Sequence, residues 1–433
     1  MALRQVARHL SGLSHVYPQG LFVPLGLRAI TSTSGAQLAE PQLAQAEEPA
    51  GAGLPRWERE LGAVRTDWTR QEIMEVYQTS FIDLVHKAAI VHRMYNDPSM
   101  VQRCTLLSIK TGGCPETCNY CSQSSSWSKE TGLKAEKLMG LDEVYEAALR
   151  ARESGSTRFC MGAAWRGPSQ VGERQWDRVL TMVKQIRGLG MEVCTTLGML
   201  TPEQAKELRE AGLTAYNHNL DTSPEYYDKI TSSRKYEDRL DTLENVRLAG
   251  ISVCAGGIIG LGEGESDRVG LIHQLATLPA HPESVPINRL VAVKGTPFEG
   301  HEAPSGLDLV RCIAVSRIVM PRTVVRLSAG RLDLTIADQA LAFMAGANSI
   351  FDGDKLLTTK NNDRDVDAAM FATLGLSSRP AFMPYASGNE SSRAFESSEP
   401  LPPMSPAMSA GPGSQQGAKE AKAASGCCGG GCS

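Results

Sequence analysis

Three cysteines close together in the sequence are the residues best suited to hold a metal centre. Cys114, Cys118 and Cys121 form the pattern C-x3-C-x2-C in TGGCPETCNYCSQ, directly after a segment that is predicted to be a β-strand. Three thiolates on one short loop that contains Gly and Pro can surround a single cluster. Because iron–sulfur clusters commonly take four cysteine ligands, three would leave one iron open to a ligand with an amine and a carboxylate.

A zinc site is the alternative for this loop. Zinc prefers closed tetrahedral sites built from Cys and His, so a fourth ligand such as His92 or His218 would be needed. The x3-x2 spacing is less usual for zinc than paired C-x2-C units, and this favours an iron–sulfur cluster. The chain has 11 cysteines, an odd number that argues against complete disulfide pairing and for thiols as metal ligands.

Four further residues occupy corresponding places on separate predicted strands. They are Cys160 in RFCMGA, Cys194 in EVCTTL, Cys254 in SVCAGG and Arg326 in VVRLSA. In a closed barrel alternate strand residues face the lumen, so the four could converge on one interior site. Simple packing is the alternative, because free cysteine is among the residues most often buried.

Polar residues alternate at the end of the fourth predicted strand. Asn217, Asn219 and Asp221 lie in YNHNLD, and their spacing of two places them on one face of a strand. Buried without partners, such side chains would cost several kcal/mol, which suggests a ligand site. A polar loop in which Asp221 or Ser223 caps the next helix is the alternative.

The elements that must position these residues alternate between strand and helix. Eight short β-branched runs are separated by helical patterns, for example at 142–155, 201–212, 237–250 and 306–320. Gly212 and Gly250 suit left-handed helix ends. We therefore predict an α/β fold, a (β/α)8 TIM-type barrel, although an open doubly wound sheet fits the same periodicity. Residues 57–93 are expected to add helices outside the barrel or across its base.

The two ends of the chain differ from this alternating region. Residues 1–39 contain Arg4, Arg8 and Arg28 but no acidic residue, which predicts a mitochondrial transit peptide and a matrix location. A disordered extension is the alternative. We expect residues 40–66 to be a linker, 67–386 the barrel, and 387–433 a disordered Ser/Pro/Gly-rich tail. Cys427, Cys428 and Cys432 in this tail are expected to be incidental thiols, with metal coordination as the alternative.

Charge and hydropathy exclude two broad classes. Among 433 residues, 44 Lys and Arg face 48 Asp and Glu, and the net charge of −4 argues against a general nucleic-acid binder. No run of about 18 apolar residues exists, so no membrane span is predicted.

The cysteine loop is that of the radical S-adenosylmethionine enzymes, and the segments around it resemble the biotin synthase family. These segments are LLSIKTGGCPETCNYCSQSS, FCMGAAWR, YNHNLDTSPE, GGIIGLGE, ESVPIN, VKGTP, VRLSAGR and FMAGANSIF. The resemblance runs from about Trp68 to Leu376 and covers the whole predicted barrel. It implies a sulfurtransferase that inserts sulfur into dethiobiotin by radical chemistry to form biotin, the last step of biotin biosynthesis.

The resemblance also implies roles for residues. The loop cysteines would hold a [4Fe–4S] cluster, and Cys160, Cys194, Cys254 and Arg326 a [2Fe–2S] cluster that donates sulfur. Ligation by Arg326 follows from the resemblance alone, because a guanidinium is normally a cation without acceptor capacity. S-adenosylmethionine would contact Tyr120, Ala163, Asn219, Asp221 and Arg239, and dethiobiotin would contact Asn217, Asn219 and Asn288; no catalytic side chain beyond the cluster ligands is expected.

Two of these assignments have simple alternatives: without the resemblance, Tyr120 suits a packing role and Arg239 a solvated helix position. The family further implies an external electron donor of flavodoxin or ferredoxin type, the iron–sulfur assembly machinery and a homodimer. Arg289 and Asp354 stand where the family has other residue types, so substrate contacts near them are open.

Two other functions fit parts of this pattern. A lipoyl synthase or another radical enzyme would share the loop, but lipoyl synthase should show a second N-terminal cysteine motif, and only Cys104 precedes Cys114. A non-enzymatic iron–sulfur or zinc carrier need not bind S-adenosylmethionine.

Overall fold

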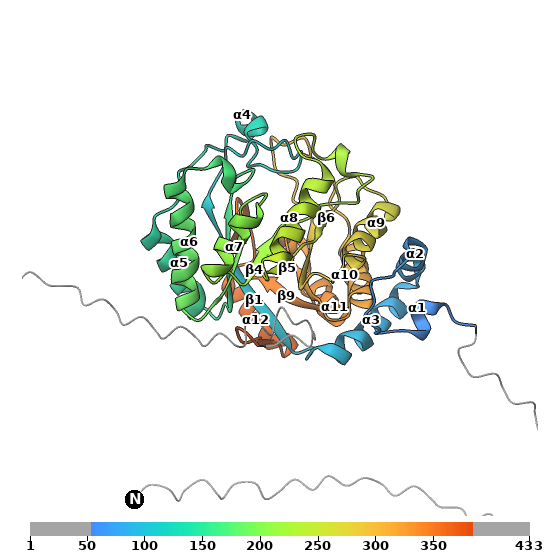
Figure 1. Ribbon diagram of the computed structural model, residues 1–433. Coiled ribbons are helices and arrows are strands. Elements are labelled where there is room, and N and C mark those ends of the chain that lie inside the picture. Colours follow the sequence, from blue (N-terminus) through green and yellow to red (C-terminus); the bar gives the residue numbers. More distant parts are fainter. Residues whose placement is uncertain (1–52, 384–433) are drawn as a thin grey trace, which may run out of the picture. The chain divides into compact units, whose positions relative to one another are not determined.

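Eight parallel strands close into a barrel in the computed structural model, which describes residues 53–383 (Figure 1). They are β1 (Met100–Lys110), β2 (Arg158–Ala163), β3 (Glu192–Thr196), β4 (Ala215–Asn217), β5 (Ser252–Cys254) with β6 (Gly257–Ile259), β7 (Ser284–Arg289), β8 (Val324–Leu327) and β9 (Ala347–Phe351). β9 pairs in parallel with β1, where Phe351 lies opposite Cys104. This closure confirms the predicted barrel and excludes the open sheet.

A helix follows each barrel strand and covers its outer side (Figure 1). These helices are α5 (Leu141–Glu153), α6 (Glu173–Gly188), α7 (Pro202–Glu210), α8 (Tyr236–Leu248), α9 (Glu265–Ala276), α10 (Gly306–Val319), α11 (Ile336–Met344) and α12 (Arg364–Leu374). On α6 the buried residues Val179, Val183 and Ile186 recur at helical spacing, and each such side chain contributes roughly 1.5–3 kcal/mol by leaving water. Gly212 and Gly250 have φ values of 94° and 73°, as expected for left-handed helix ends.

Three helices precede the barrel and pack outside it, as expected. They are α1 (Arg56–Arg59), α2 (Arg70–Gln78) and α3 (Phe81–Tyr95). α2 packs against α9, and α3 against α10 and α11. The Trp68 indole N–H donates to the carbonyl of Val319 at the end of α10, at 3.1 Å. No helix among residues 53–383 is long and apolar enough to cross a bilayer.

Small elements complete the described part of the chain. β12 (Ser377–Ser378) pairs with the start of β1, and β10 (Lys355–Leu356) forms a hairpin with β11 (Thr359–Lys360). The loop after β1 contains η1 (Ser125–Trp127) and α4 (Ser128–Thr131). The expected transit peptide, residues 40–52 of the expected linker and the cysteine-containing tail lie outside the described residues. The described part of the expected linker, 53–66, includes the short helix α1.

Candidate active site

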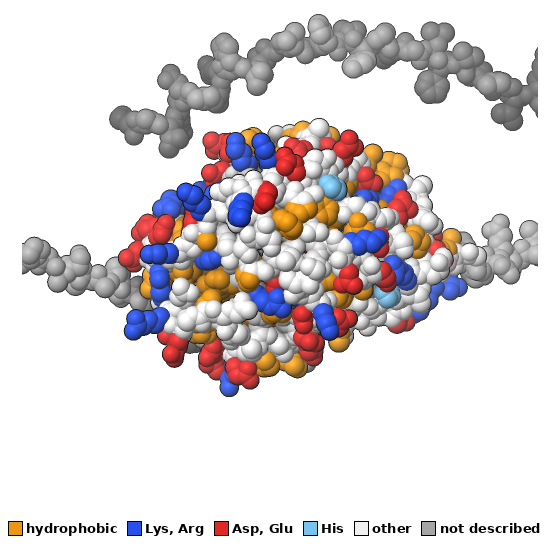
Figure 2. Space-filling view, turned by 90° about the horizontal axis from the view of Figure 1, so that it is seen from above, with side chains coloured by type: hydrophobic (Ala, Val, Ile, Leu, Met, Phe, Trp, Pro, Cys, Tyr) orange, Lys and Arg blue, Asp and Glu red, His pale blue; other side chains and the backbone are white. Residues whose placement is uncertain are grey.

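A cavity of about 360 Å³ extends from the barrel lumen to the loops that follow the strands. Its wall includes every site residue expected from the sequence except Cys254: Cys114, Cys118, Tyr120, Cys121, Cys160, Ala163, Cys194, Asn217, Asn219, Asp221, Arg239, Asn288 and Arg326. Seen from above, the molecule carries charged side chains of both signs, with no large area of one sign (Figure 2). The carboxyl ends of barrel strands are where (β/α)8 enzymes place their active sites.

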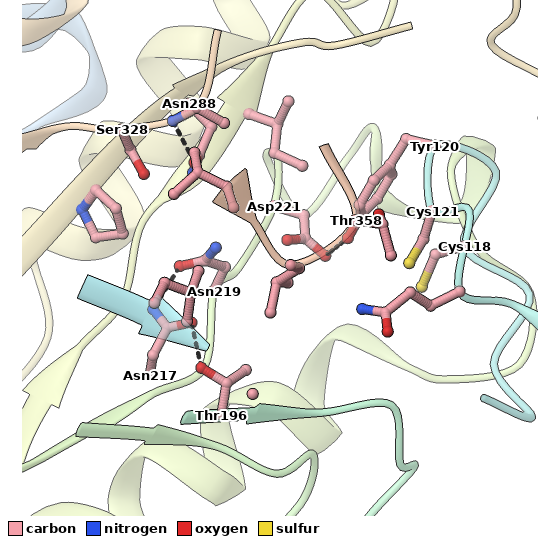
Figure 3. Close-up of a pocket in the computed structure, with 18 of the residues that line it drawn as sticks. Cys118, Tyr120, Cys121, Thr196, Asn217, Asn219, Asp221, Asn288, Ser328 and Thr358 are labelled. Carbon is pink, nitrogen blue, oxygen red and sulfur yellow. Dashed lines mark hydrogen bonds between the residues drawn. The ribbon is translucent and has the colours of Figure 1, made fainter. Parts of the chain in front are cut away.

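The cysteine loop is held in shape by its own backbone. The amide of Cys114 donates to the carbonyl of Gln123 at 2.9 Å, and the amide of Ser125 donates to the carbonyl of Cys114 at 2.7 Å. The indole N–H of Trp127 donates to the carbonyl of Cys118 at 3.2 Å. Figure 3 shows the side chains of Cys118 and Cys121 projecting from the loop, and both residues line the cavity. The loop therefore presents these thiols together.

Glu116, between Cys114 and Cys118, anchors the loop to the rest of the barrel. Its buried carboxylate pairs with Arg166 and Arg234, each at 3.0 Å, and accepts a hydrogen bond from the Ser233 hydroxyl. This role could not be predicted from the sequence, because a single Glu in a loop resembles a solvated surface charge.

Burial disfavours the charged form of the loop thiols. Burial, with a smaller effect of the Cys118 thiol, raises the pKa of Cys121 to about 12, and burial also raises the pKa values of Cys114 and Cys118. A cluster that takes up thiolates would offset this cost.

The candidate ligands among residues 53–383 do not form a closed metal site. No three Cys, His, Asp or Glu side chains there converge closely enough to hold one metal ion, and this applies to the three loop cysteines as well. With Zn–S bonds of about 2.3 Å, zinc would need its sulfur ligands roughly 4 Å apart, whereas a larger cluster accepts wider spacing. His92 lies on α3 outside the barrel, and His218 lines the cavity without being part of such a group.

The second set of predicted ligands meets in the lumen. Cys160 on β2 lies opposite Cys194 on β3, and the two thiols are within hydrogen-bonding contact. Cys254 on β5 lies 3.8 Å from Nη1 of Arg326. The buried Arg326 side chain is fixed by Ser349, whose hydroxyl accepts from Nε at 3.0 Å.

Cys104 on β1 is a further lumen residue that the sequence reasoning did not select. It is fully buried, its sulfur lies 3.5 Å from Nη2 of Arg326, and its thiol contacts Cys160. Strand alternation places Cys104 on the same face of β1 as Leu106, two residues later. Leu106 lies opposite Cys160 on β2, so this face belongs to the same region as the predicted ligands.

A polar layer lies beside these thiols. Arg158 and Glu192 form a buried ion pair at 2.7 Å. Gln102 donates to the same carboxylate at 2.9 Å, while its own carbonyl oxygen accepts from Arg326 at 3.4 Å. Arg326 is therefore held by fixed polar partners on more than one strand.

The expectation that Asn217, Asn219 and Asp221 share one strand face is wrong in its geometry. β4 ends at Asn217, and Asp221 has a φ of 67°, so the chain turns there instead of continuing as a strand. All three nevertheless line the cavity, where Asn217 donates to Asn219 at 3.0 Å and accepts from Thr196 at 3.2 Å (Figure 3).

Asp221 does not cap a helix. Its carboxylate accepts a hydrogen bond from the Tyr120 hydroxyl at 2.7 Å (Figure 3). The same carboxylate forms an ion pair with Arg239. Arg239 is buried and not solvated, and its Nε donates to the Tyr227 hydroxyl at 2.6 Å. Asn288 donates to the carbonyl of Gly257 at 2.9 Å, so its position is also fixed.

Known proteins share both the sequence and the fold. Residues 108–275 match the Radical SAM superfamily, and residues 286–377 match the Biotin and Thiamin Synthesis associated domain. The mitochondrial biotin synthase of Arabidopsis thaliana is 59% identical over 317 residues, which cover 73% of this chain and 83% of that protein. The biotin synthase of Cytophaga hutchinsonii is 56% identical over 319 residues, covering 74% of this chain and 94% of that protein.

A fungal relative and solved structures agree with these matches. The biotin synthase of Schizosaccharomyces pombe is 54% identical over 325 residues, covering 74% of this chain and 88% of that protein. The crystal structure of a methylornithine synthase superimposes with a TM-score of 0.61 at 18% identity, covering 76% of this chain and 96% of that one. The crystal structure of a maturase of the [FeFe]-hydrogenase superimposes with a TM-score of 0.62 at 16% identity, covering 76% of this chain and 74% of that one. These structures show a shared fold.

Proposed function

This chain belongs to the biotin synthase family of radical S-adenosylmethionine enzymes, and we propose that it forms biotin by inserting sulfur into dethiobiotin, with two sets of cysteines that divide the reaction. One set lies on the loop after β1 and the other in the lumen, and one cavity reaches all three loop cysteines and, of the lumen set, Cys160 and Cys194. This shared cavity is the observation that carries the proposal, because a radical made at one set must reach a substrate carbon beside the other.

The loop cysteines Cys114, Cys118 and Cys121 would hold a [4Fe–4S] cluster. The fit rests on three thiols presented by one pre-shaped loop with no fourth cysteine on it. Such a cluster would supply the electron that cleaves S-adenosylmethionine, and ligation by only three cysteines would leave a place for the amine and carboxylate of that molecule.

Residues around the loop would bind the rest of S-adenosylmethionine. Asn219 and Asp221 would hold the ribose, and Tyr120 and Ala163 would lie beside the base. Arg239 has five N–H donors, and its contacts with Tyr227, Asn219 and Asp221 engage three of them. It can therefore fix Asp221 and still donate to the carboxylate of the methionine.

The lumen residues Cys160, Cys194, Cys254 and Arg326 would hold a [2Fe–2S] cluster that is the source of the inserted sulfur. Contact between Cys160 and Cys194 and between Cys254 and Arg326 supports two ligand pairs, one for each iron. The barrel wall keeps water from these groups, since all four are buried.

Three amide side chains would bind dethiobiotin between the two sets. Asn217, Asn219 and Asn288 line the cavity, and an amide both donates and accepts hydrogen bonds, as the ureido group of dethiobiotin requires. Their fixed hydrogen bonds support an orientation set before substrate arrives.

Anaerobic iron and sulfide analysis with Mössbauer spectroscopy tests this proposal. Wild type should show two cluster types, and Cys160→Ala should lose only the [2Fe–2S] signal. Cys312→Ala is the matched control, because Cys312 is a buried thiol on α10 outside the lumen. A single cluster type that Cys160→Ala leaves unchanged would contradict sulfur donation from this site. The protein would then be a radical enzyme that acts on another substrate.

The cellular context is part of the proposal. The Arabidopsis thaliana relative is named as mitochondrial, and this supports residues 1–39 as a transit peptide to the matrix. Fusion of these residues to a fluorescent protein tests the location. The remaining partners are a reduced flavodoxin- or ferredoxin-type donor, the iron–sulfur assembly machinery and a second copy of the chain, and sedimentation measures the last of these.

A further inference from the structure

One lumen thiol has no part in the ligand set described above. The sulfur of Cys104 lies 3.5 Å from Nη2 of Arg326, while the sulfur of Cys254 lies 3.8 Å from Nη1 of the same guanidinium. Cys104 also contacts the thiol of Cys160. The arginine side chain is thus flanked by two cysteines, only one of which belongs to the proposed ligands.

The surroundings of Cys104 differ from those of a cysteine that only packs. Cys312 on α10 belongs to the large apolar core and lies beside Ile259, Leu271 and Ile287. Cys104 instead has the Gln102 carbonyl oxygen at 3.5 Å and the Ser349 hydroxyl at 3.7 Å, in addition to its contacts with sulfur and guanidinium. Leu106 and Phe351 also pack against the cluster that contains Cys104, so apolar packing accounts for only part of the surroundings of this thiol.

Cys104 and Arg326 differ in their suitability as ligands of the proposed [2Fe–2S] cluster. A thiolate is the ordinary ligand of iron–sulfur clusters, whereas a guanidinium must give up a proton before its nitrogen can bind iron. We propose that Cys104 is an alternative ligand for the iron that Arg326 serves, so that the [2Fe–2S] cluster has one ligand set with Arg326 and one with four cysteines. This inference rests on the proposed function of the lumen residues.

The exchange between the two ligand sets balances without an external reagent. In this exchange an Fe–N bond to Arg326 would break, an Fe–S bond to Cys104 would form, and the thiol proton of Cys104 would pass to the released guanidine nitrogen. No electron is transferred, and the total charge of the site stays the same. Charge conservation matters here because Cys104 and Arg326 are both buried, where an uncompensated charge is costly.

Spectra of anaerobically reconstituted variants test this inference without an activity assay. Arg326→Ala should keep the [2Fe–2S] cluster, with a Mössbauer and visible absorption spectrum shifted to that of a four-cysteine cluster. Arg326→Ala combined with Cys104→Ser should lose it, because both alternative donors are gone. Arg326→Ala combined with Cys312→Ser is the matched control and should keep it. The [4Fe–4S] signal in the same samples reports an intact barrel.

Two results would overturn the inference: loss of the [2Fe–2S] cluster in Arg326→Ala alone, or its survival in the double variant without Cys104. If Arg326→Ala also loses the [4Fe–4S] signal and has therefore not folded, Arg326→Gln takes its place with the same criteria. Cys194→Ser tests the proposed function separately. A wild-type protein without a second cluster, or a Cys194→Ser variant that keeps it, refutes the lumen site itself, whatever Cys104 does.

Discussion

Asp221 and Arg239 form an ion pair in which both side chains are almost completely buried, and the same carboxylate accepts a hydrogen bond from Tyr120. Tyr120 stands between two cysteines of the loop after β1, and Asp221 lies just beyond β4. The pair therefore connects the proposed [4Fe–4S] loop to the wall that would hold S-adenosylmethionine.

Asp221→Asn should weaken binding of S-adenosylmethionine by about tenfold or more and destabilise the fold by about 3–5 kcal/mol. The substitution keeps the size of the side chain but leaves the buried Arg239 cation without its carboxylate. Equilibrium dialysis with S-adenosylmethionine and urea unfolding measure the two effects. Asp228→Asn, an exposed residue nearby, should change neither. Unchanged affinity in Asp221→Asn would exclude the proposed ribose contact.

Glu116→Gln should reduce the iron bound by the loop cysteines. The variant keeps a hydrogen-bonding side chain but removes the charge that pairs with Arg166 and Arg234, and breaking a buried pair costs about 3–5 kcal/mol. The measurement is iron content with the electron paramagnetic resonance signal of the reduced [4Fe–4S] cluster. Glu136→Gln, exposed in the segment that follows the loop, is the control. A full cluster signal in Glu116→Gln would mean that the loop keeps its shape without this anchor.

Elements that depend on neighbouring residues could be predicted from the sequence. The β-branched runs predicted all eight barrel strands, and Gly212 and Gly250 follow helices in the left-handed conformation that was expected for glycine. The pairing of β12 with β1 was not predicted, because it joins short segments far apart in the chain.

The site residues that sequence analysis missed also depend on contacts between segments far apart in the chain. Cys104, Glu116 and the turn at Asp221 were missed because each depends on partners from distant parts of the chain. Cys104 appears as one more buried thiol until the register places it beside Arg326, and Glu116 appears exposed until Arg166 and Arg234 surround it. The loop cysteines could be found because three ligands lie within one short motif.

His92 should make the fold sensitive to acid. Burial, aided by the nearby Arg317 cation, lowers the pKa of His92 to about 3, well below the ordinary value near 6.5. The unfolded chain therefore binds a proton below pH 6.5 that the folded chain does not bind, so stability is lost as the pH falls from 6.5 toward 3.

His92→Leu, measured by urea unfolding of the reconstituted protein, should reveal this contribution. Between pH 7 and pH 5 the wild type should lose about 2 kcal/mol more than the variant, since one pKa unit corresponds to about 1.4 kcal/mol. Burial also lowers the pKa values of His218 and His281, but these effects are common to both proteins and cancel in the difference. Parallel curves for the two proteins would show that His92 is protonated within the fold.

Gly256→Ala should disturb the wall of the cavity more than its size suggests. A β-carbon at this position would lie 2.0 Å from the carbonyl oxygen of Pro286 on β7, so the backbone between β5 and β6 must move. The same residue donates its amide to Asn219 at 3.2 Å and accepts from the amide of Leu220 at 2.9 Å. We expect a loss of about 3 kcal/mol in stability and weaker binding of S-adenosylmethionine, because the end of β4 moves with it.

Gly188→Ala is the matched control for this effect. It is the last residue of α6, and a β-carbon there would meet no atom within 4 Å, so stability should stay within about 1 kcal/mol of the wild type. Urea unfolding and equilibrium dialysis measure both variants. Equal stability and affinity in Gly256→Ala and Gly188→Ala would show that β7 yields to the added methyl group, and that the position of Asn219 does not depend on close contact between these strands.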